Sequence, residues 1–407
     1  MPLDPDATVV VVGASLAGLR AAETMRSEGH GGAVVLIGAE PHLPYDRPPL
    51  SKQYLAGTWD LDRVTLRTPE KIDELGLDLR LGRRATGLDL AAKSVALDDG
   101  SAVSFDALVV ATGARPRPLQ GSEGIAGVHL LRTLDDCQAL RDATADPGTR
   151  LVVVGAGFIG AEVAATCHGR GLDVTVLEAL PVPLARALGE QMGAACAALH
   201  ERNGVRLRTG TAVAGLRTDA GDPPRITGVE LADGTVVPAD VVVVGIGVVP
   251  VTEWLEGSAL EVRNGVVADA TLHAADGVVV AGDVARWPDD DGDGDIRVEH
   301  WTNAAEQGVH AAKSLLAGRK AAMAYRPVPY FWSDQYDVKI QVLGLPGPDD
   351  DVEVVDGSLA DGRFVALYGR HGKLTAALGF GRPRQLMGYR SLLESRAGFS
   401  EALAHGA

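Results

Sequence analysis

The chain has 407 residues, of which 46% are hydrophobic, 23% are charged and 4% are aromatic, and its formal net charge is -16 at pH 7. This length is enough for two or three domains, each with its own core. The negative charge argues against general attraction to nucleic acid or to anionic membranes. No apolar run reaches the ~20 residues that span a bilayer, and the N-terminus lacks the pattern of a secretory signal, so we expect a cytoplasmic protein.

The three cysteines, Cys137, Cys167 and Cys196, are odd in number and far apart in the chain. Metal sites and disulfide frameworks need closely spaced or paired cysteines. We therefore expect reduced thiols.

The first predicted unit is an apolar strand at 9–12, a glycine-rich turn at 13–18 and a helix through residue 25. The turn is a G-x-G-x-x-G fingerprint with Ser15 in place of the middle glycine, and such turns bring backbone N–H groups to a pyrophosphate. The next strand ends at Glu40, whose carboxylate suits the hydroxyls of a ribose. The motif predicts a dinucleotide site, and the alternative is a vestigial site left by gene duplication.

A complete fingerprint follows the apolar strand at 151–154, with glycines at 155, 157 and 160 and a helix from residue 161. The phosphates of a dinucleotide would lie at the positive end of that helix. The next strand ends at Glu178, which is expected to accept hydrogen bonds from a ribose and to repel a 2′-phosphate, so NADH is predicted over NADPH. The alternative is a glycine turn of an ordinary α/β protein. Two such sites suggest electron transfer between two cofactors.

An internal duplication supports an insertion of one domain into another. Residues 95–113 and 229–247 share the order of a strand, a turn with glycine and a buried strand that ends in glycine. We predict an α/β protein with two Rossmann-like dinucleotide-binding domains and a C-terminal α+β domain. The predicted bounds are 1–115 with 248–320 for the first domain, 116–247 for the inserted domain and 321–407 for the last. The last domain is expected to hold strands at 338–343, 363–368 and 373–378 and a helix around 385–393.

The acidic loop at 289–295 resembles part of a calcium-binding loop, because its aspartates alternate from residue 289. The twelfth position is His300, where a bidentate glutamate is needed, and Pro288 stands where a preceding helix would end. We therefore interpret the segment as a solvated acidic loop and predict no metal site.

Five motifs in this order resemble the FAD-dependent, NADH-linked ferredoxin reductases of the putidaredoxin reductase type, which serve cytochrome P450s and aromatic-ring dioxygenases. The motifs are Tyr45–Lys52, Ala111–Pro116, Gly155–Glu162, Ala281–Asp283 and Glu299–Trp301. The resemblance implies a glutathione-reductase-like fold, FAD and NADH as cofactors and a [2Fe–2S] ferredoxin as partner. The partner must carry the cluster, since three scattered cysteines cannot form a four-thiolate site. The resemblance also implies a monomer or a weak homodimer.

The resemblance assigns site residues. Those expected to contact FAD are Gly13, Ser15, Leu16, Ala17, Gly18, Glu40, Arg47, Lys52, Ala111, Thr112, Gly113, Arg115, Gly282, Asp283, Glu299, His300, Trp301 and Trp332. Those expected to contact NADH are Gly155, Gly157, Phe158, Ile159, Gly160, Glu162 and Glu178.

By similarity to the family, Lys52 would lie near flavin N5 and pair with Glu162 close to the nicotinamide, which makes these two the expected catalytic residues. From the residues alone, other interpretations stay open. Lys52 and Arg47 flank a Pro-Pro pair and could be surface charges, and Glu162 could be an ordinary acid in the first turn of a helix. Asp283 could be an N-cap, and the nearby aromatic residues could belong to the core.

Two other functions fit the same motifs. An apoptosis-inducing-factor-like protein would bind FAD and NADH without ferredoxin turnover, and an NADH oxidase would need no protein partner. A disulfide reductase is disfavoured, because no close cysteine pair is present. Four arginines in the C-terminal region could steer an acidic ferredoxin or simply form a solvated helix face; they are Arg382, Arg384, Arg390 and Arg396.

Overall fold

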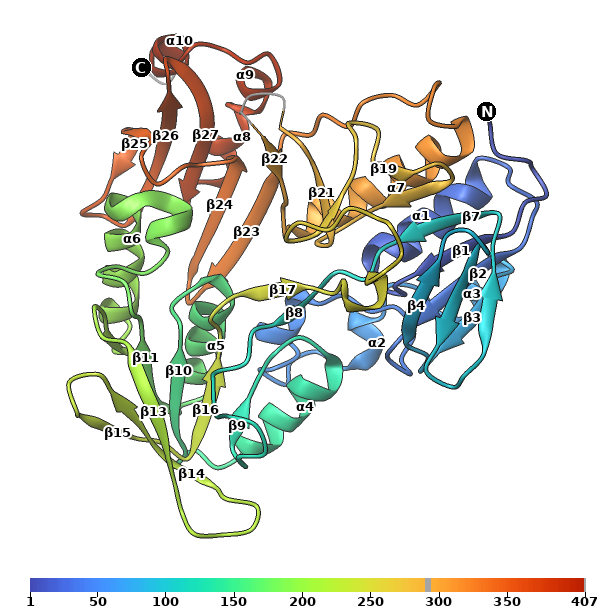
Figure 1. The fold of residues 1–407 in the computed structure, drawn as a ribbon. Helices are drawn as coiled ribbons and strands as arrows, with labels where there is room; N and C mark the ends of the chain where they lie inside the picture. Colours follow the sequence, from blue (N-terminus) through green and yellow to red (C-terminus); the bar gives the residue numbers. More distant parts are fainter. Residues whose placement is uncertain (290–293, 406–407) are drawn as a thin grey trace. The chain divides into compact units, whose positions relative to one another are not determined.

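A computed structural model gives the structure of this chain, and it describes residues 1–289 and 294–405. The chain forms two compact units (Figure 1). Unit 1 comprises Met1–Asp46, Leu61–Arg115 and Val249–Pro327, and unit 2 comprises Arg47–Asp60, Pro116–Val248 and Val328–Ala407. The chain passes from one unit to the other five times, and two of these crossings lie within the short strands β8 (Ala114–Pro116) and β17 (Val248–Pro250).

The core of unit 1 is a six-stranded sheet in the order β19-β20-β7-β1-β2-β3, parallel except for β19. Its central strand β1 consists of four buried valines, which is the pattern of a parallel strand that is covered on both faces. The strands are β1 (Val9–Val12), β2 (Val34–Gly38), β3 (Asp78–Leu81), β7 (Ala107–Val110), β19 (His273–Ala275) and β20 (Val278–Val280).

Two helices of unit 1, α1 (Leu16–Ser27) and α7 (Trp301–Ala317), pack against each other, as the blue and orange helices beside β1 and β7 show (Figure 1). The remaining elements are α2 (Leu61–Val64), α3 (Pro69–Glu74), η2 (Glu253–Leu255), the sheet of β4 (Ala85–Asp89), β5 (Ser94–Leu97) and β6 (Ala102–Ser104), and the sheet of β18 (Val266–Val267), β21 (Ala285–Pro288) and β22 (Asp295–Ile296).

Unit 2 contains a five-stranded parallel sheet in the order β12-β11-β10-β16-β9. Its strands are β9 (Val128–His129), β10 (Arg150–Val154), β11 (Asp173–Leu177), β12 (Arg206–Arg208) and β16 (Val241–Val244). The antiparallel strands β13 (Val213–Thr218), β14 (Ile226–Leu231) and β15 (Val236–Pro238) contribute to the same apolar core as β10 and β16. The helices are α4 (Leu134–Ala143), α5 (Phe158–Gly169) and α6 (Ala185–Arg202).

The C-terminal part of unit 2 is an antiparallel sheet in the order β23-β24-β27-β26-β25 (Figure 1). Apolar side chains of α6 and of this sheet form one core, which contains Leu188, Met192, Phe364 and Phe380. The strands are β23 (Tyr330–Gln335), β24 (Val338–Gly344), β25 (Asp351–Ser358), β26 (Arg363–Arg370) and β27 (Lys373–Phe380). They are followed by α8 (Pro383–Met387), α9 (Arg390–Glu394) and α10 (Phe399–His405).

The segment 47–60, with η1 (Pro48–Ser51), packs within unit 2 although it lies early in the chain. The Cys137 thiol on α4 donates to the Leu50 carbonyl at 3.1 Å, and the Thr166 hydroxyl on α5 donates to the Ser51 carbonyl at 2.7 Å. Compact units need not coincide with domains in the evolutionary sense. The predicted domain bounds therefore stay a prediction.

The mixed α/β architecture agrees with the predicted fold class. The helix expected around 385–393 is wrong in one respect, because it is divided into α8 and α9 at Gly388 and Tyr389. Glycine is a poor helix former, which explains the break.

Within residues 1–289 and 294–405, no helix is long and apolar enough to cross a membrane. Among the same residues, no group of three or more His, Cys, Asp or Glu side chains is arranged to hold a metal ion. Residues 290–293 of the acidic loop, where calcium was considered, lie outside the described part of the chain.

Candidate dinucleotide-binding sites

The first glycine loop joins β1 to α1 at the carboxyl edge of the unit 1 sheet. Gly13 has a φ of 122°, and a Cβ there would lie 2.1 Å from the Ala111 carbonyl oxygen, so no larger residue fits. Gly13 therefore brings this loop against residues 111–113, which follow β7. Ser15 is the N-cap residue of α1 with a φ of -111° and a ψ of -162°, an extended backbone that tolerates a side chain.

Three further predicted residues lie at the ends of strands in unit 1. Glu40 follows β2 and accepts a hydrogen bond from the Tyr45 hydroxyl. The Thr112 hydroxyl donates to the Val251 carbonyl at 2.7 Å. Arg115 forms a half-exposed ion pair with Glu253 at 2.7 Å.

Gly282 and Asp283 follow β20 at the same edge. The Gly282 N–H donates to Gln307 Oε1 on α7 at 2.8 Å, and Gln307 is completely buried. Its other polar atom, Nε2, is buried without a hydrogen-bond partner among the described residues. A buried donor rarely stays unsatisfied. The orphaned donor beside Gly282 therefore fits a ligand with acceptor oxygens, such as a dinucleotide.

His300 and Trp301 begin α7. Burial lowers the pKa of His300 to about 4, and the nearby Asp283 carboxylate opposes this only in part, so the imidazole is neutral at neutral pH. The Trp301 indole N–H donates to Asp46 at 2.5 Å. Glu299 precedes them and forms an ion pair with Arg297 at 2.6 Å.

The second glycine loop joins β10 to α5 in unit 2. Gly155 has a φ of 99°, and a Cβ there would lie 2.4 Å from the Gly245 carbonyl oxygen. A Cβ at Gly157 would have its nearest neighbour 3.9 Å away, so the backbone at Gly157 borders open space. Phosphate oxygens can approach backbone N–H groups at such a position, in front of a helix N-terminus.

Glu178, at the end of β11, lies beside this loop. Its carboxylate accepts from the Ala156 N–H and from the Leu180 N–H, each at 2.9 Å. The two bonds use one lone pair on each oxygen, so acceptor capacity remains for ribose hydroxyls. The donors and acceptors around this loop thus fit a dinucleotide.

Lys52 and Glu162 form a buried ion pair in unit 2, with 2.6 Å between Nζ and Oε2. Glu162, on α5, is 2% exposed, and Ser51 donates to the same oxygen at 2.6 Å. Ser333 on β23 donates to Oε1 at 2.7 Å. A buried charge is tolerated when it is paired and hydrogen-bonded, and Glu162 meets both conditions.

The predicted residues are divided between the units. Gly13–Gly18, Glu40, Ala111–Gly113, Arg115, Gly282, Asp283 and Glu299–Trp301 belong to unit 1, and Arg47, Lys52, Gly155–Gly160, Glu162, Glu178 and Trp332 belong to unit 2. Ile159, in the first turn of α5, is 49% exposed. Arg47 donates to the Arg132 carbonyl. Trp332 stacks on Tyr330, with ring centroids 6.1 Å apart.

Sequence reasoning missed Ser51, Ser333, Gln335 and Gln307 as polar partners in these sites. A signal for two of them was present, because Ser333 and Gln335 are two residues apart, and in an extended segment such as β23 both side chains lie on one face. A polar residue on such a face needs a partner. Gln307 left no comparable signal, since its partner is a backbone N–H distant in the chain.

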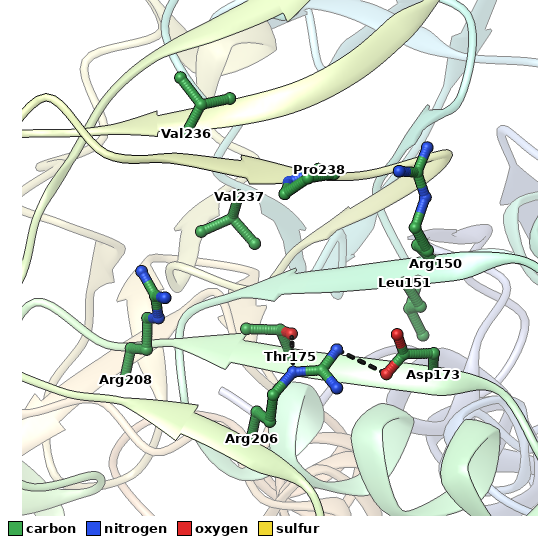
Figure 2. A pocket seen from close by; sticks show the side chains of 9 residues that line it. All are labelled: Arg150, Leu151, Asp173, Thr175, Arg206, Arg208, Val236, Val237 and Pro238. Atoms are coloured by element: carbon green, nitrogen blue, oxygen red, sulfur yellow. Dashed lines mark hydrogen bonds and ion pairs between the residues drawn. The ribbon is translucent and has the colours of Figure 1, made fainter.

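A separate cavity of about 240 Å³ lies at the amino ends of β10, β11 and β12, away from the glycine loop at the carboxyl ends. In Figure 2 the Arg206 guanidinium points to Asp173, with 2.5 Å between N and O, and also contacts the Thr175 hydroxyl. Both members of the ion pair are more than half exposed, and such pairs contribute little to stability. The lining is Arg150, Leu151, Asp173, Thr175, Arg206, Arg208, Val236, Val237 and Pro238.

The C-terminal arginines are partly neutralised by neighbours. Arg382 lies 3.1 Å from Asp356, and Arg390 lies 3.0 Å from Glu394. The net positive charge of this region is therefore smaller than its arginine count suggests.

Known proteins resemble this chain along almost its whole length. Residues 7–308 match the family model of pyridine nucleotide-disulphide oxidoreductases, and residues 330–405 match the reductase C-terminal model. Rhodocoxin reductase of Rhodococcus erythropolis is 39% identical over 95% of this chain and 89% of its own length. Putidaredoxin reductase of Pseudomonas putida is 36% identical over 95% of this chain and 92% of its own length.

The solved structures agree with the sequence relatives. In the covalent putidaredoxin reductase–putidaredoxin complex, the matching chain has a TM-score of 0.92 at 33% identity, and the match covers 99% of this chain and 98% of that one. These matches and the two glycine loops lead to one assignment. The chain belongs to the pyridine nucleotide-disulphide oxidoreductase family, among its FAD-dependent ferredoxin reductases.

Proposed function

We propose that this protein is a flavoprotein reductase that passes electrons from NADH through FAD to a [2Fe–2S] ferredoxin, which in turn supplies a P450 or a dioxygenase. The observation that carries the proposal is the presence of two glycine loops of dinucleotide-binding type in one chain whose relatives are ferredoxin reductases. Bound FAD would take a hydride from NADH and release electrons singly, as a one-electron iron–sulfur partner requires.

The residues of unit 1 would bind FAD. The loop at 13–18 would hold the pyrophosphate of FAD, and Glu40 would accept from its adenosine ribose. Asp283 and the orphaned Gln307 donor would bind the ribitol and neighbouring oxygens. The neutral His300 at the start of α7 would add no charge of its own, so the helix N-terminus would supply the positive potential near the flavin.

The residues of unit 2 would bind NADH and position the Lys52 ammonium. The loop at 155–160 would hold the pyrophosphate of NADH, and Glu178 would bind its ribose and repel a 2′-phosphate. Glu162 Oε1 accepts a hydrogen bond from Ser333 and retains capacity for the carboxamide N–H of nicotinamide. The ion pair with Glu162 would hold the Lys52 ammonium in one place.

The cysteines argue against disulfide chemistry, although the family name includes it. All three thiols are buried and free. Burial raises the pKa to about 12 for Cys137, about 11 for Cys167 and about 12 for Cys196. Thiolates are the reactive form, so these cysteines are inert at neutral pH.

Reduction of cytochrome c by NADH, measured with and without an added [2Fe–2S] ferredoxin, tests the proposal. We expect rapid reduction only when the protein, FAD and the ferredoxin are all present. A long-lived reduced flavin that ignores the ferredoxin would favour the apoptosis-inducing-factor-like alternative. Fast consumption of oxygen without any ferredoxin would favour an NADH oxidase.

A cytoplasmic location also remains a prediction, which cell fractionation tests.

A further inference from the structure

The buried ion pair of unit 2 receives its third contact from the C-terminal sheet. We infer that Ser333 on β23 is a positioning residue, which orients the Glu162 carboxylate and, through it, the Lys52 ammonium for reaction with NADH. This inference rests on the proposed function for its kinetic consequence. Its structural part, the orientation of Glu162, does not depend on that function.

The two oxygens of Glu162 are held by donors from different segments of the chain. Ser51 and Lys52, which follow the Pro-Pro pair, both donate to Oε2 at 2.6 Å. Ser333 is the donor that the structure gives to Oε1, at 2.7 Å. Two donors on one oxygen fix its position but leave the carboxylate able to rotate about it, so the contact with Oε1 sets the orientation of the group.

The neighbours of Ser333 determine which way its hydroxyl donates. Gln335, two residues further along the same strand, donates from Nε2 to Ser333 Oγ at 3.2 Å. An ionised carboxylate can only accept, and a hydroxyl has a single hydrogen to donate. With Gln335 directed at its lone pair, Ser333 points its hydrogen at Glu162. Ser333 and Gln335 are both completely buried, so water does not compete for these bonds.

Strand β23 and helix α5 are packed together where these bonds form. Phe331 on β23 meets Phe158, the first residue of α5, with ring centroids 4.8 Å apart and planes at 68°. Edge-to-face packing of this kind restricts sliding of one element along the other. The C-terminal sheet therefore acts as a rigid support for the Lys52–Glu162 pair.

The position of Lys52 depends on the Glu162 carboxylate, because the other hydrogen-bond acceptors around its ammonium lie further away. Beyond Glu162, its ammonium donates to the Pro48 carbonyl at 3.1 Å and to Ser51 Oγ at 3.4 Å. Its side chain is only 10% exposed, so water supplies few further partners. If the carboxylate rotates about Oε2, the lone pairs of this oxygen turn with it, and the ammonium has to move to keep its shortest hydrogen bond.

The test uses the full-length FAD-loaded protein with four variants. Ser333→Ala removes the donor, Ser333→Thr keeps the hydroxyl and Gln335→Leu removes only the bond to Ser333 Oγ. Ser314→Ala is the matched control, a buried serine on α7 in unit 1. The readouts are the rate of flavin reduction as a function of NADH concentration under anaerobic conditions, and crystal structures of the variants.

For Ser333→Ala we expect a saturating rate about tenfold lower, as for a lost hydrogen bond to a charged group, with the half-saturating NADH concentration changed less than about twofold. The crystal structure should show the Glu162 carboxylate rotated. Ser333→Thr should restore both readouts, and Ser314→Ala should change neither. Gln335→Leu also removes Gln335 Oε1, which is buried without a hydrogen-bond partner, so this variant should fold normally. Its saturating rate of flavin reduction should fall about twofold to threefold.

Three results would overturn the inference: Ser333→Ala with the wild-type rate, a slower variant in which Glu162 has not moved, or an equal loss of rate in Ser314→Ala. If Ser333→Ala does not fold, an unchanged rate in Gln335→Leu is decisive against it. If NADH fails to reduce even the wild-type flavin, the proposed function fails, and the orientation of Glu162 in the crystal structures still decides the structural part.

Discussion

The two glycine loops of this chain are built alike but differ at the middle position and in the surroundings of their acids. Both begin with a glycine whose Cβ would collide with a carbonyl oxygen, 2.1 Å away for Gly13 and 2.4 Å away for Gly155. The middle position is Ser15 in unit 1 and Gly157, which faces open space, in unit 2. The shared glycine thus serves the strand–turn–helix geometry, and we infer that the variable position serves the ligand.

The acidic residues beside the two loops, Glu40 and Glu178, differ in their hydrogen-bond donors. Glu40 is bonded by a side chain, the Tyr45 hydroxyl, whereas Glu178 is bonded by two backbone N–H groups at its own loop. A backbone contact positions Glu178 at the start of α5 whatever side chains surround it. We interpret unit 1 as the site of a resident cofactor and unit 2 as the site of an exchanging substrate.

The largest expected effect comes from the shared glycine. Gly13→Ala should yield protein without bound flavin, because both the positive φ and the contact with Ala111 forbid a side chain. Gly155→Ala should keep its yellow colour but lose reduction by NADH. Absorbance spectra before and after NADH check this, with Gly169→Ala, where a Cβ would meet nothing within 4 Å, as control. Equal loss of flavin from Gly13→Ala and Gly155→Ala would contradict the assignment of FAD to the first loop and NADH to the second.

The next largest effect concerns Glu178. Replacing it with alanine and the exposed Ala179 with arginine should lower the preference for NADH over NADPH by about 100-fold, because a repulsive charge is removed and an attractive one is added. The ratio of kcat/KM for the two nucleotides measures this. The same pair of changes should leave the flavin content untouched. Unchanged selectivity would show that Glu178 does not contact the ribose.

A smaller effect is expected from exchanging the middle residues. Gly157→Ser would place a hydroxymethyl group in the open space where the phosphates of NADH approach, and should raise KM for NADH about tenfold without unfolding the protein. Ser15→Gly should retain the flavin. Steady-state kinetics and flavin content measure the two effects. An unaltered KM in Gly157→Ser would mean that the NADH phosphates bind elsewhere.

The smallest effect concerns the pH dependence of stability, to which one buried histidine in each unit contributes. These are His200 in unit 2 and His300 in unit 1. Burial lowers the pKa of each to about 4 from 6.5. Above pH 6.5 the imidazole is neutral in the folded and the unfolded chain, and between 6.5 and about 4 only the unfolded chain binds the proton. The free energy of unfolding should therefore fall by about 2 kcal/mol per histidine between neutral pH and about pH 5.

His200→Gln removes the titrating group while leaving an amide near the Tyr336 hydroxyl, which lies 2.7 Å from His200 Nδ1. Denaturant unfolding across this pH range should show a shallower loss of stability in this variant. His371→Gln, at an exposed position, is the control. An equal pH dependence in the variant and the wild type would contradict the lowered pKa of His200.

The parts of this account that could be predicted from the sequence are those that depend on local pattern. Apolar strands followed by glycine turns predicted both loops, and Glu178 was predicted as a ribose-binding acid because the dinucleotide fingerprint has a carboxylate at the end of its second strand. Lys52 and Glu162 were paired through family resemblance, since 110 residues separate them. The contact of Ser333 with Glu162 spans 171 residues. Such contacts depend on how sheets and helices pack, and a single sequence carries no local signal for that.

The packing of residues 47–60 within unit 2 has the same origin. Their Pro-Pro pair predicts a stiff turn, but the bonds that hold the turn come from Cys137 and Thr166, far along the chain. Local pattern therefore predicts the turn and not its surroundings.

An anaerobic absorbance titration of the FAD-loaded protein shows whether NADH and FAD exchange electrons within one molecule and whether the electrons leave to a ferredoxin. We expect NADH to bleach the flavin and an oxidised [2Fe–2S] ferredoxin to restore its yellow colour. A protein that stays colourless after incubation with FAD, or a yellow one that NADH cannot bleach, would contradict this expectation.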